Sequence, residues 1–117
     1  MGLKRVVVSG LGALTPIGND IKSYWNGLKS GLSGADKITY FDTSKFKTQF
    51  ACELKGYDPM DFFDRKAGRK LDRFSQYAIV SSDEAINDSG LNNEAIDKGR
   101  VGVIWGSGIG GLKTFQE

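Results

Sequence analysis

Two short apolar segments, each followed directly by a glycine-rich stretch, constrain the fold of this 117-residue chain most strongly. Residues 5–9 read Arg-Val-Val-Val-Ser, and residues 100–105 read Arg-Val-Gly-Val-Ile-Trp. Continuous runs of β-branched residues are typical of strands that are buried on both faces, as in a parallel sheet. Because helical patterns lie between and after these two runs, we expect an α/β fold.

The helices are predicted from the spacing of apolar residues and from the residues that end each pattern. Residues 21–28 carry one apolar face and are followed by Gly31. The longest periodic run extends from Leu71 to Asp88 and stops at Gly90, a residue type that commonly ends helices. Shorter helical pieces are expected after Asp58, over residues 92–96 and over residues 110–117.

Residues 32–58 show no helical periodicity and are expected to form an irregular excursion. Within it, the apolar side chains of Phe50, Cys52 and Leu54 alternate along the chain and predict a short, half-buried strand. Cys52 is the only cysteine. A lone free thiol is most often a small buried hydrophobe, so we expect Cys52 to be structural.

The composition is that of a globular protein, with 39% apolar and 26% charged residues. A net charge of +2 is too small to indicate nucleic-acid binding. No run approaches the roughly 18 apolar residues that a membrane span needs, so we expect a cytoplasmic protein without membrane contact. The chain contains no histidine and one cysteine, which excludes Cys/His and Ser/His nucleophile pairs, histidine-containing zinc sites and disulfides from within these residues.

Half of the ten residues from Asp64 to Arg73 are basic, so this tract has a local net charge of +3 in a chain whose total is +2. On one continuous helix the basic residues would lie within an arc of roughly 140°. These residues are Arg65, Lys66, Arg69, Lys70 and Arg73. Such a face presents a positive field to an acidic partner. The alternative is the solvated face of an ordinary amphipathic helix, which Gly68 would weaken by about 1 kcal/mol relative to alanine.

Residues 106–111 read Gly-Ser-Gly-Ile-Gly-Gly, a G-x-G-x-x-G pattern between a predicted strand and a predicted helix. Because this is the context of dinucleotide binding, a dinucleotide-dependent oxidoreductase is one alternative function. The confirming acidic residue about 20 positions later cannot be present, since six residues follow the pattern. In residues 10–15 the third glycine is replaced by Thr15. For these stretches we favour a tight turn or a close backbone contact over phosphate binding. A further alternative is a non-catalytic module that binds an acidic protein through Arg65 to Arg73.

Several short blocks follow one another along the chain at residues 6–12, 15–19, 41–44, 65–66, 69–72, 76–77, 88–91 and 106–111. They include Val-Val-Val-Ser-Gly-Leu-Gly, Thr-Pro-Ile-Gly-Asn, Phe-Asp-Thr-Ser, Asp-Ser-Gly-Leu and Gly-Ser-Gly-Ile-Gly-Gly. In this order and spacing the blocks resemble the start of the β-ketoacyl-acyl-carrier-protein synthases. The resemblance is best to the elongating bacterial synthase II type, and the modular polyketide relatives rank second.

This resemblance implies a thiolase-like fold, in which two similar α/β halves stack as a five-layered sandwich. Residues 1–117 would be the amino-terminal part of the first half, with no complete second domain. The implied activity is that of an acyltransferase, the decarboxylative Claisen condensation of malonyl-carrier protein with acyl-carrier protein in fatty-acid elongation, carried out by a homodimer. Family catalysis uses a cysteine nucleophile and two histidines. Cys52 does not match that cysteine, so no catalytic residue, cofactor or metal site is expected in this chain.

The resemblance also implies two functional surfaces. The basic tract matches the family's docking patch for the acidic acyl carrier protein, with Lys66, Arg69 and Lys70 as the first candidates and Arg65 as the next. Ile109 matches a side chain that lines and gates the acyl pocket near the dimer interface. Glycines beside it, Gly108 among them, would let the loop move or approach the substrate closely.

Overall fold

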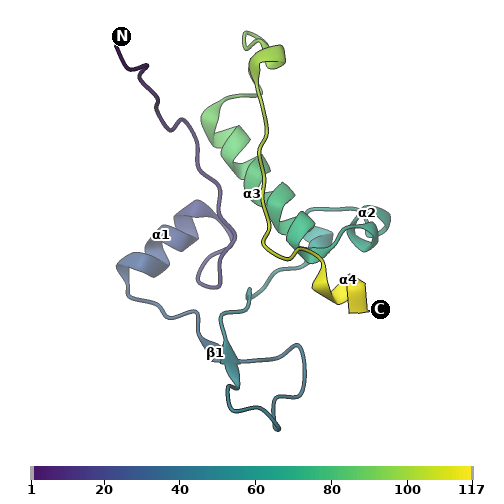
Figure 1. Cartoon of the computed structure of the whole chain (residues 1–117). Helices are drawn as coiled ribbons and strands as arrows, with labels where there is room; N and C mark the ends of the chain where they lie inside the picture. Colours follow the sequence, from purple (N-terminus) through teal and green to yellow (C-terminus); the bar gives the residue numbers. More distant parts are fainter. Residues whose placement is uncertain (1, 117) are drawn as a thin grey trace.

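The structure is a computed structural model that describes residues 2–116, and its longest element is the helix α3 (Arg73–Ser89) (Figure 1). Before α3 along the chain come α1 (Ile21–Lys29), β1 (Asp36–Lys37), β2 (Phe50–Ala51), the 3-10 turn η1 (Pro59–Asp61) and α2 (Arg65–Lys70). After α3 come the 3-10 turn η2 (Lys98–Arg100) and α4 (Leu112–Gln116). α4 confirms the helix predicted after residue 110, whereas Glu117 lies outside the described residues.

Helix α3 ends where the sequence predicts and begins two residues later than predicted. Gly90 follows its last turn with φ of 72°, a left-handed conformation that glycine adopts without a steric cost. At the other end, Leu71 is extended, with φ of −100° and ψ of 129°. Leu71 therefore belongs to a break between α2 and α3, and the predicted start at Leu71 is wrong.

Helix α1 confirms the prediction for residues 21–28. The Asp20 carboxylate accepts a hydrogen bond from the Ser23 backbone N–H at 2.8 Å and caps the first turn. The Ser23 hydroxyl also donates to this carboxylate, and these hydrogen bonds lower the pKa of Asp20. The predicted apolar face is largely uncovered among the described residues, because Trp25 is 59% exposed.

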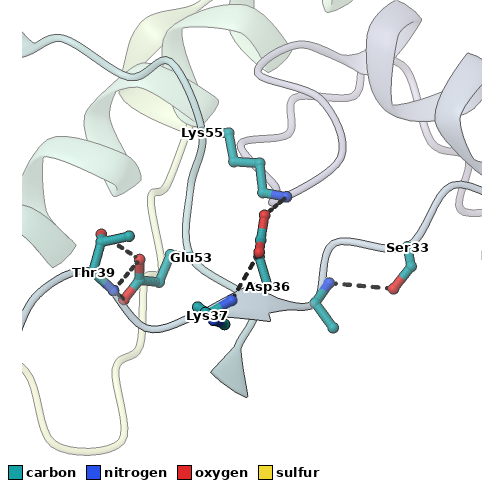
Figure 2. Close-up of polar contacts among 7 residues, drawn as sticks. Ser33, Asp36, Lys37, Thr39, Glu53 and Lys55 are labelled. Carbon is teal, nitrogen blue, oxygen red and sulfur yellow. Dashed lines mark hydrogen bonds and ion pairs between the residues drawn. The ribbon is translucent and has the colours of Figure 1, made fainter. Parts of the chain in front are cut away.

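The excursion over residues 32–58 contains a two-stranded antiparallel ribbon, in which Asp36 pairs with Ala51. Side chains of the flanking residues hold the ribbon (Figure 2). The Glu53 carboxylate accepts from the Thr39 N–H at 3.0 Å and from the Thr39 hydroxyl at 2.7 Å, which lowers the pKa of Glu53. Lys55 Nζ lies 3.2 Å from an Asp36 oxygen.

A short strand forms within the predicted segment, but the prediction that it extends past Cys52 and half-buries the alternating side chains is wrong. Strand β2 ends at Ala51, and Cys52 is exposed rather than buried. Phe50 is 64% exposed, and Leu54 alone of the three alternating apolar residues is half-buried. A ribbon with strands of two residues has too little surface to cover the alternating apolar side chains. No layer of the described residues packs against them.

The two strands predicted at residues 5–9 and 100–105 do not form in the part of the chain that the structure describes. Figure 1 draws both segments as plain tubes without strand arrows, purple at the amino terminus and yellow-green before α4. Val6 is 89% exposed and Ile104 is 99% exposed. A strand needs a neighbour to accept its N–H groups and donate to its carbonyls, and residues 2–116 bring no such neighbour to either segment.

The short helix predicted at residues 92–96 is also wrong, because this region forms turns. The Asn93 side chain accepts a hydrogen bond from the Ala95 N–H at 3.0 Å. Asparagine favours turns through bonds of this kind, and they compete with the helix.

The described residues form an open structure with a very small core. The radius of gyration is 17.6 Å, whereas a compact domain of this length has about 13 Å. Among residues 2–116, only Gly27 of α1 and Gln76 and Val80 of α3 are buried. No helix in the described part of the chain is long and apolar enough to cross a membrane.

Candidate functional site

The basic residues of the predicted docking tract come from two helices, not one. In α2, the Asp64 carboxylate accepts from the backbone N–H groups of Lys66 at 2.8 Å and Ala67 at 2.7 Å, which fixes the start of the helix at Arg65. The helix ends at Lys70, and Arg73 opens α3 after the break at Leu71. The prediction that all five basic residues share one helical face is therefore wrong for Arg73.

The four basic residues of α2 stay together. Their side chains line one shallow surface hollow and are exposed: Arg65, Lys66, Arg69 and Lys70. The one ion pair formed within residues 2–116 joins Lys55 to Asp36, so these four cations have no acidic partner in the described chain. We call these four residues the α2 basic face. Its uncompensated charge is what an acidic partner would meet.

Arg73, itself exposed, is instead part of an aromatic cluster. Its guanidinium lies 5.6 Å from the centre of the Tyr40 ring, a cation-π contact. A hydrogen bond with Tyr77 is the main cause that raises the pKa of Arg73. The ring of Tyr77 packs edge-on against Tyr57, with 5.1 Å between ring centres. Arg73 therefore connects α3 to the excursion at Tyr40, and it borders the α2 basic face from a different helix, since it lines a hollow with Arg69 and Lys70.

Gln76 attaches α2 to α3. Its Nε2 donates to the carbonyl oxygens of Gly68 at 2.8 Å and Leu71 at 3.0 Å, and its Oε1 accepts from the Tyr57 hydroxyl at 3.0 Å. Gln76 is 4% exposed. This role of Gln76 was not predicted from the sequence. The one sequence signal is weak: Gln76 lies four residues before the apolar Val80, on the same side of the helix.

The first glycine stretch makes the close backbone contact that we favoured. A Cβ on Gly12 would overlap the carbonyl of Ser81, and one on Gly10 would lie 2.6 Å from the Cβ of Ser89. The glycines therefore let the amino-terminal segment lie directly on α3.

Two backbone N–H groups of this stretch, and that of Ile21 at the start of α1, are bonded to carboxylates of α3. Leu11 donates to Asp88 at 2.9 Å, Ala13 donates to Glu84 at 2.8 Å, and Ile21 donates to the other oxygen of Glu84 at 2.8 Å. N–H groups held in this way cannot cradle a phosphate, and the carboxylates would repel one. The phosphate-binding alternative is not supported here.

In the second glycine stretch, an acidic side chain occupies the position that a dinucleotide would need. The Asp72 carboxylate lies against Gly111 and accepts a hydrogen bond from the Thr114 hydroxyl, at the start of α4. In dinucleotide-binding folds the pyrophosphate occupies such a helix start. Asp72 thus disfavours the oxidoreductase alternative.

The predicted substrate-binding residues lie on the exposed side of this stretch. Ile109 is 81% exposed, and nothing lies within 4 Å of a Cβ built on Gly108. Ile109 lines a shallow hollow with Phe74 and Phe115 but is not enclosed by the described residues. A neighbouring hollow is lined by Arg69 and Lys70 together with residues 110–114, so the glycine stretch and the α2 basic face are adjacent. The structure does not test the acyl-pocket role of Ile109 and Gly108, which stays a prediction.

Comparison with known proteins assigns the chain to a family. A family model described as "Beta-ketoacyl synthase, N-terminal domain" matches residues 3–117. The 3-oxoacyl-[acyl-carrier-protein] synthase 2 of Staphylococcus aureus (strain COL) is 48% identical over 113 residues, which cover 97% of this chain and 27% of that protein. The enzyme of the same name from Synechocystis is 46% identical over 114 residues, with the same two coverages.

A solved structure agrees with this assignment. The crystal structure of a β-ketoacyl synthase from Burkholderia phymatum matches with a TM-score of 0.69 at 32% identity, over 90% of this chain and 26% of that one. The predicted thiolase-like fold class is confirmed by this match, although its parallel sheet is not formed within residues 2–116. This chain spans about a quarter, 27%, of the length of the curated relatives named above. Because a family model described as the N-terminal domain matches residues 3–117, the chain belongs to the β-ketoacyl synthase family, within that domain.

Proposed function

We propose that residues 1–117 are the amino-terminal part of the first thiolase-like half of an elongating 3-oxoacyl-[acyl-carrier-protein] synthase of the synthase 2 type. The observation that carries this proposal is the 48% identity over 97% of the chain to a protein of that name. The proposed reaction is the decarboxylative condensation of malonyl-carrier protein with acyl-carrier protein, in the cytoplasm and by a homodimer. Its cysteine and histidine chemistry belongs to residues other than these 117, which contain no histidine.

The proposed role of the α2 basic face is to dock the acyl carrier protein, an acidic partner. Four exposed cations without an internal acidic partner support this role, as does the carrier protein named in the relatives' own description. Contacts at a charged, solvent-exposed surface act mainly on the association rate and on salt sensitivity. The proposed role of Ile109, with Gly108 beside it, is to line the acyl pocket next to this docking face.

The docking role is tested by charge reversal in the full-length enzyme. Lys66→Glu with Lys70→Glu should weaken carrier-protein binding about tenfold or more, equivalent to at least about 1.4 kcal/mol, because attraction becomes repulsion. Salt should weaken wild-type binding, since exposed charges are screened over about 8 to 10 Å near physiological ionic strength. Binding is measured by titration with carrier protein at low and moderate salt.

A matched control carries the same change in net charge elsewhere. Lys45→Glu with Lys47→Glu alters two exposed lysines of the excursion and should leave the affinity close to that of the wild type. Thermal melts verify that both double variants are folded, as expected for exposed substitutions that change stability by about 0.5 kcal/mol or less each. Equal affinities of the two double variants would refute docking on α2.

A further inference from the structure

We propose that Gln76 is a positioning residue for carrier-protein docking, because it holds the carboxyl end of α2 in its helical form from the neighbouring helix α3. This inference rests on the proposed docking role of the α2 basic face. Gln76 itself would not touch the carrier protein, since it is 4% exposed.

The hydrogen bonds of Gln76 pair carbonyl oxygens that the end of a helix leaves without an intrahelical partner. The last four carbonyls of an α-helix have no intrahelical partner, and Gly68 carries one of them in α2. Leu71 carries the next carbonyl beyond the helix, and both oxygens face the same Nε2 at 2.8 and 3.0 Å. A primary amide has two N–H donors on one nitrogen, so one side chain satisfies both oxygens while its own oxygen accepts from Tyr57.

Helix α2 depends on such anchors because little in its own sequence stabilises it. It has six residues, whereas isolated helices shorter than about 12 residues are marginal even with good helix formers. Gly68 lies in its interior, and four like charges repel one another along it. Asp64 fixes its first turn and Gln76 its last, so loss of Gln76 frees the turn that carries Arg69 and Lys70.

The docking face exists only while α2 is helical. Residues 65 and 69, and residues 66 and 70, come side by side because an α-helix places positions four apart on one face. If part of the population loses this turn, the apparent affinity falls in proportion to the helical fraction, although every charge is still present. Loss of Gln76 and loss of charge therefore predict different salt dependences of carrier-protein binding.

The test uses Gln76→Met in the full-length enzyme, with Tyr57→Phe as the matched control. Methionine has a similar size and removes all hydrogen bonds of Gln76, whereas Tyr57→Phe removes one bond of the same side chain and leaves those to α2. Hydrogen exchange is followed at the Gly68 amide, which donates to the Asp64 carbonyl at 2.9 Å. Carrier-protein affinity is titrated at two salt concentrations. Condensation is assayed with carrier-linked acyl groups and with a short acyl-pantetheine that lacks the carrier protein.

We expect Gln76→Met to speed exchange at Gly68 and to raise the carrier-protein Kd and KM about fivefold or more, because two part-buried carbonyls lose their donor. The salt dependence of binding and the kcat with acyl-pantetheine should match those of the wild type. A general loss of stability would instead lower the kcat with acyl-pantetheine as well. Tyr57→Phe should change hydrogen exchange at Gly68 and the affinity for carrier protein less than Gln76→Met does. Unchanged Gly68 exchange in a folded Gln76→Met enzyme would overturn the inference, as would unchanged affinity.

Two measurements keep the inference testable in every case. If Gln76→Met does not fold, the inference is tested by hydrogen exchange at the Gly68 amide of the wild-type enzyme. Exchange as fast as in an unstructured peptide would show that α2 is not held in its helical form and would contradict the inference. If the Lys66→Glu, Lys70→Glu variant binds as the wild type does, the docking proposal fails and the positioning inference fails with it. If that variant binds weakly while Gln76→Met exchanges faster and binds normally, the positioning inference alone is wrong.

Discussion

At the scale of single residues, Glu84 joins three segments of the chain. Its two carboxylate oxygens accept backbone N–H groups from Ala13 and Ile21, both at 2.8 Å, so one side chain of α3 holds the amino-terminal turn and the start of α1. Bonds from two neutral donors to one ionised acceptor are charge-assisted and stronger than neutral pairs. Glu84 is half-buried, so water replaces these bonds only in part.

We predict that Glu84→Gln lowers the free energy of unfolding of the full-length protein by about 1–3 kcal/mol, because the amide places an NH₂ group against a backbone donor. Asp83→Asn is the matched control. Asp83 is the preceding residue on the same helix, is exposed and makes no side-chain hydrogen bond within residues 2–116. The two variants are compared by urea denaturation. Equal unfolding midpoints would show that the hydrogen bonds of Glu84 do not stabilise the protein.

Residues whose role depends on close neighbours in the chain were predictable, and those that act over long separations were not. The cap before α1, the turn opened by Asp58 and the stop at Gly90 follow from local chemistry, and the structure has all three. Glu84 reaches residues 71 and 63 positions away, and no local pattern marks such a pairing. Gln76 was missed for a related reason, since a buried amide in a helix looks like any exposed glutamine until its partners are known.

At the scale of elements, the break between α2 and α3 decides which charges act together. The pattern from Arg65 to Arg73 predicted one continuous basic face because the five basic residues would share one arc of a continuous helix. The break is set by tertiary bonds, since Gln76 binds the Leu71 carbonyl and Asp72 binds Thr114 of α4. Arg73 is thereby assigned to the aromatic cluster, and the α2 basic face keeps four cations rather than five.

Two glycines in these helices should respond to alanine in opposite directions. Gly68→Ala should stabilise the protein by about 0.5–1 kcal/mol, because alanine is the better helix former. The added Cβ would meet Phe63 and Pro59 at 3.7 Å, which is ordinary contact. Gly90→Ala should destabilise it by about 1–2 kcal/mol, since Gly90 has φ of 72°, where a Cβ is strained.

Thermal melts of the two alanine variants at one pH check the signs. If both variants shift the melting temperature in the same direction, one of the two proposed glycine roles, at Gly68 or at Gly90, is wrong.

At the scale of the whole molecule, the described residues expose apolar surface that a stable monomer would cover. Val8 and Val103 are each 79% exposed, in segments whose sequences predict buried strands. The comparison with ketosynthases confirms the fold class that these segments indicate, while residues 2–116 alone do not assemble the sheet. The strand predictions failed because a parallel strand is specified by its neighbours as well as by its own residues.

We predict that the isolated 117-residue chain self-associates or unfolds at low temperature, because unpaired apolar segments act as templates for other chains. Analytical ultracentrifugation should show species larger than a monomer at micromolar concentration. A monodisperse monomer with a cooperative melt above about 55 °C, toward the upper half of the usual range for mesophilic domains, would contradict this prediction.

The attachment of the amino-terminal stretch to α3 also has a consequence for biosynthesis. Ala13 leaves the ribosome 71 residues before Glu84, the residue that holds it. At about 5–20 residues per second, this interval lasts about 4 to 14 s. Helix α3 forms within microseconds once it is synthesised, so translation, and not helix formation, sets the delay. During that delay residues 10–13 have no helix to lie against, and the neighbouring apolar residues Val6 to Val8 are exposed. A nascent chain in this state is a natural client for chaperones that bind apolar segments near the ribosome.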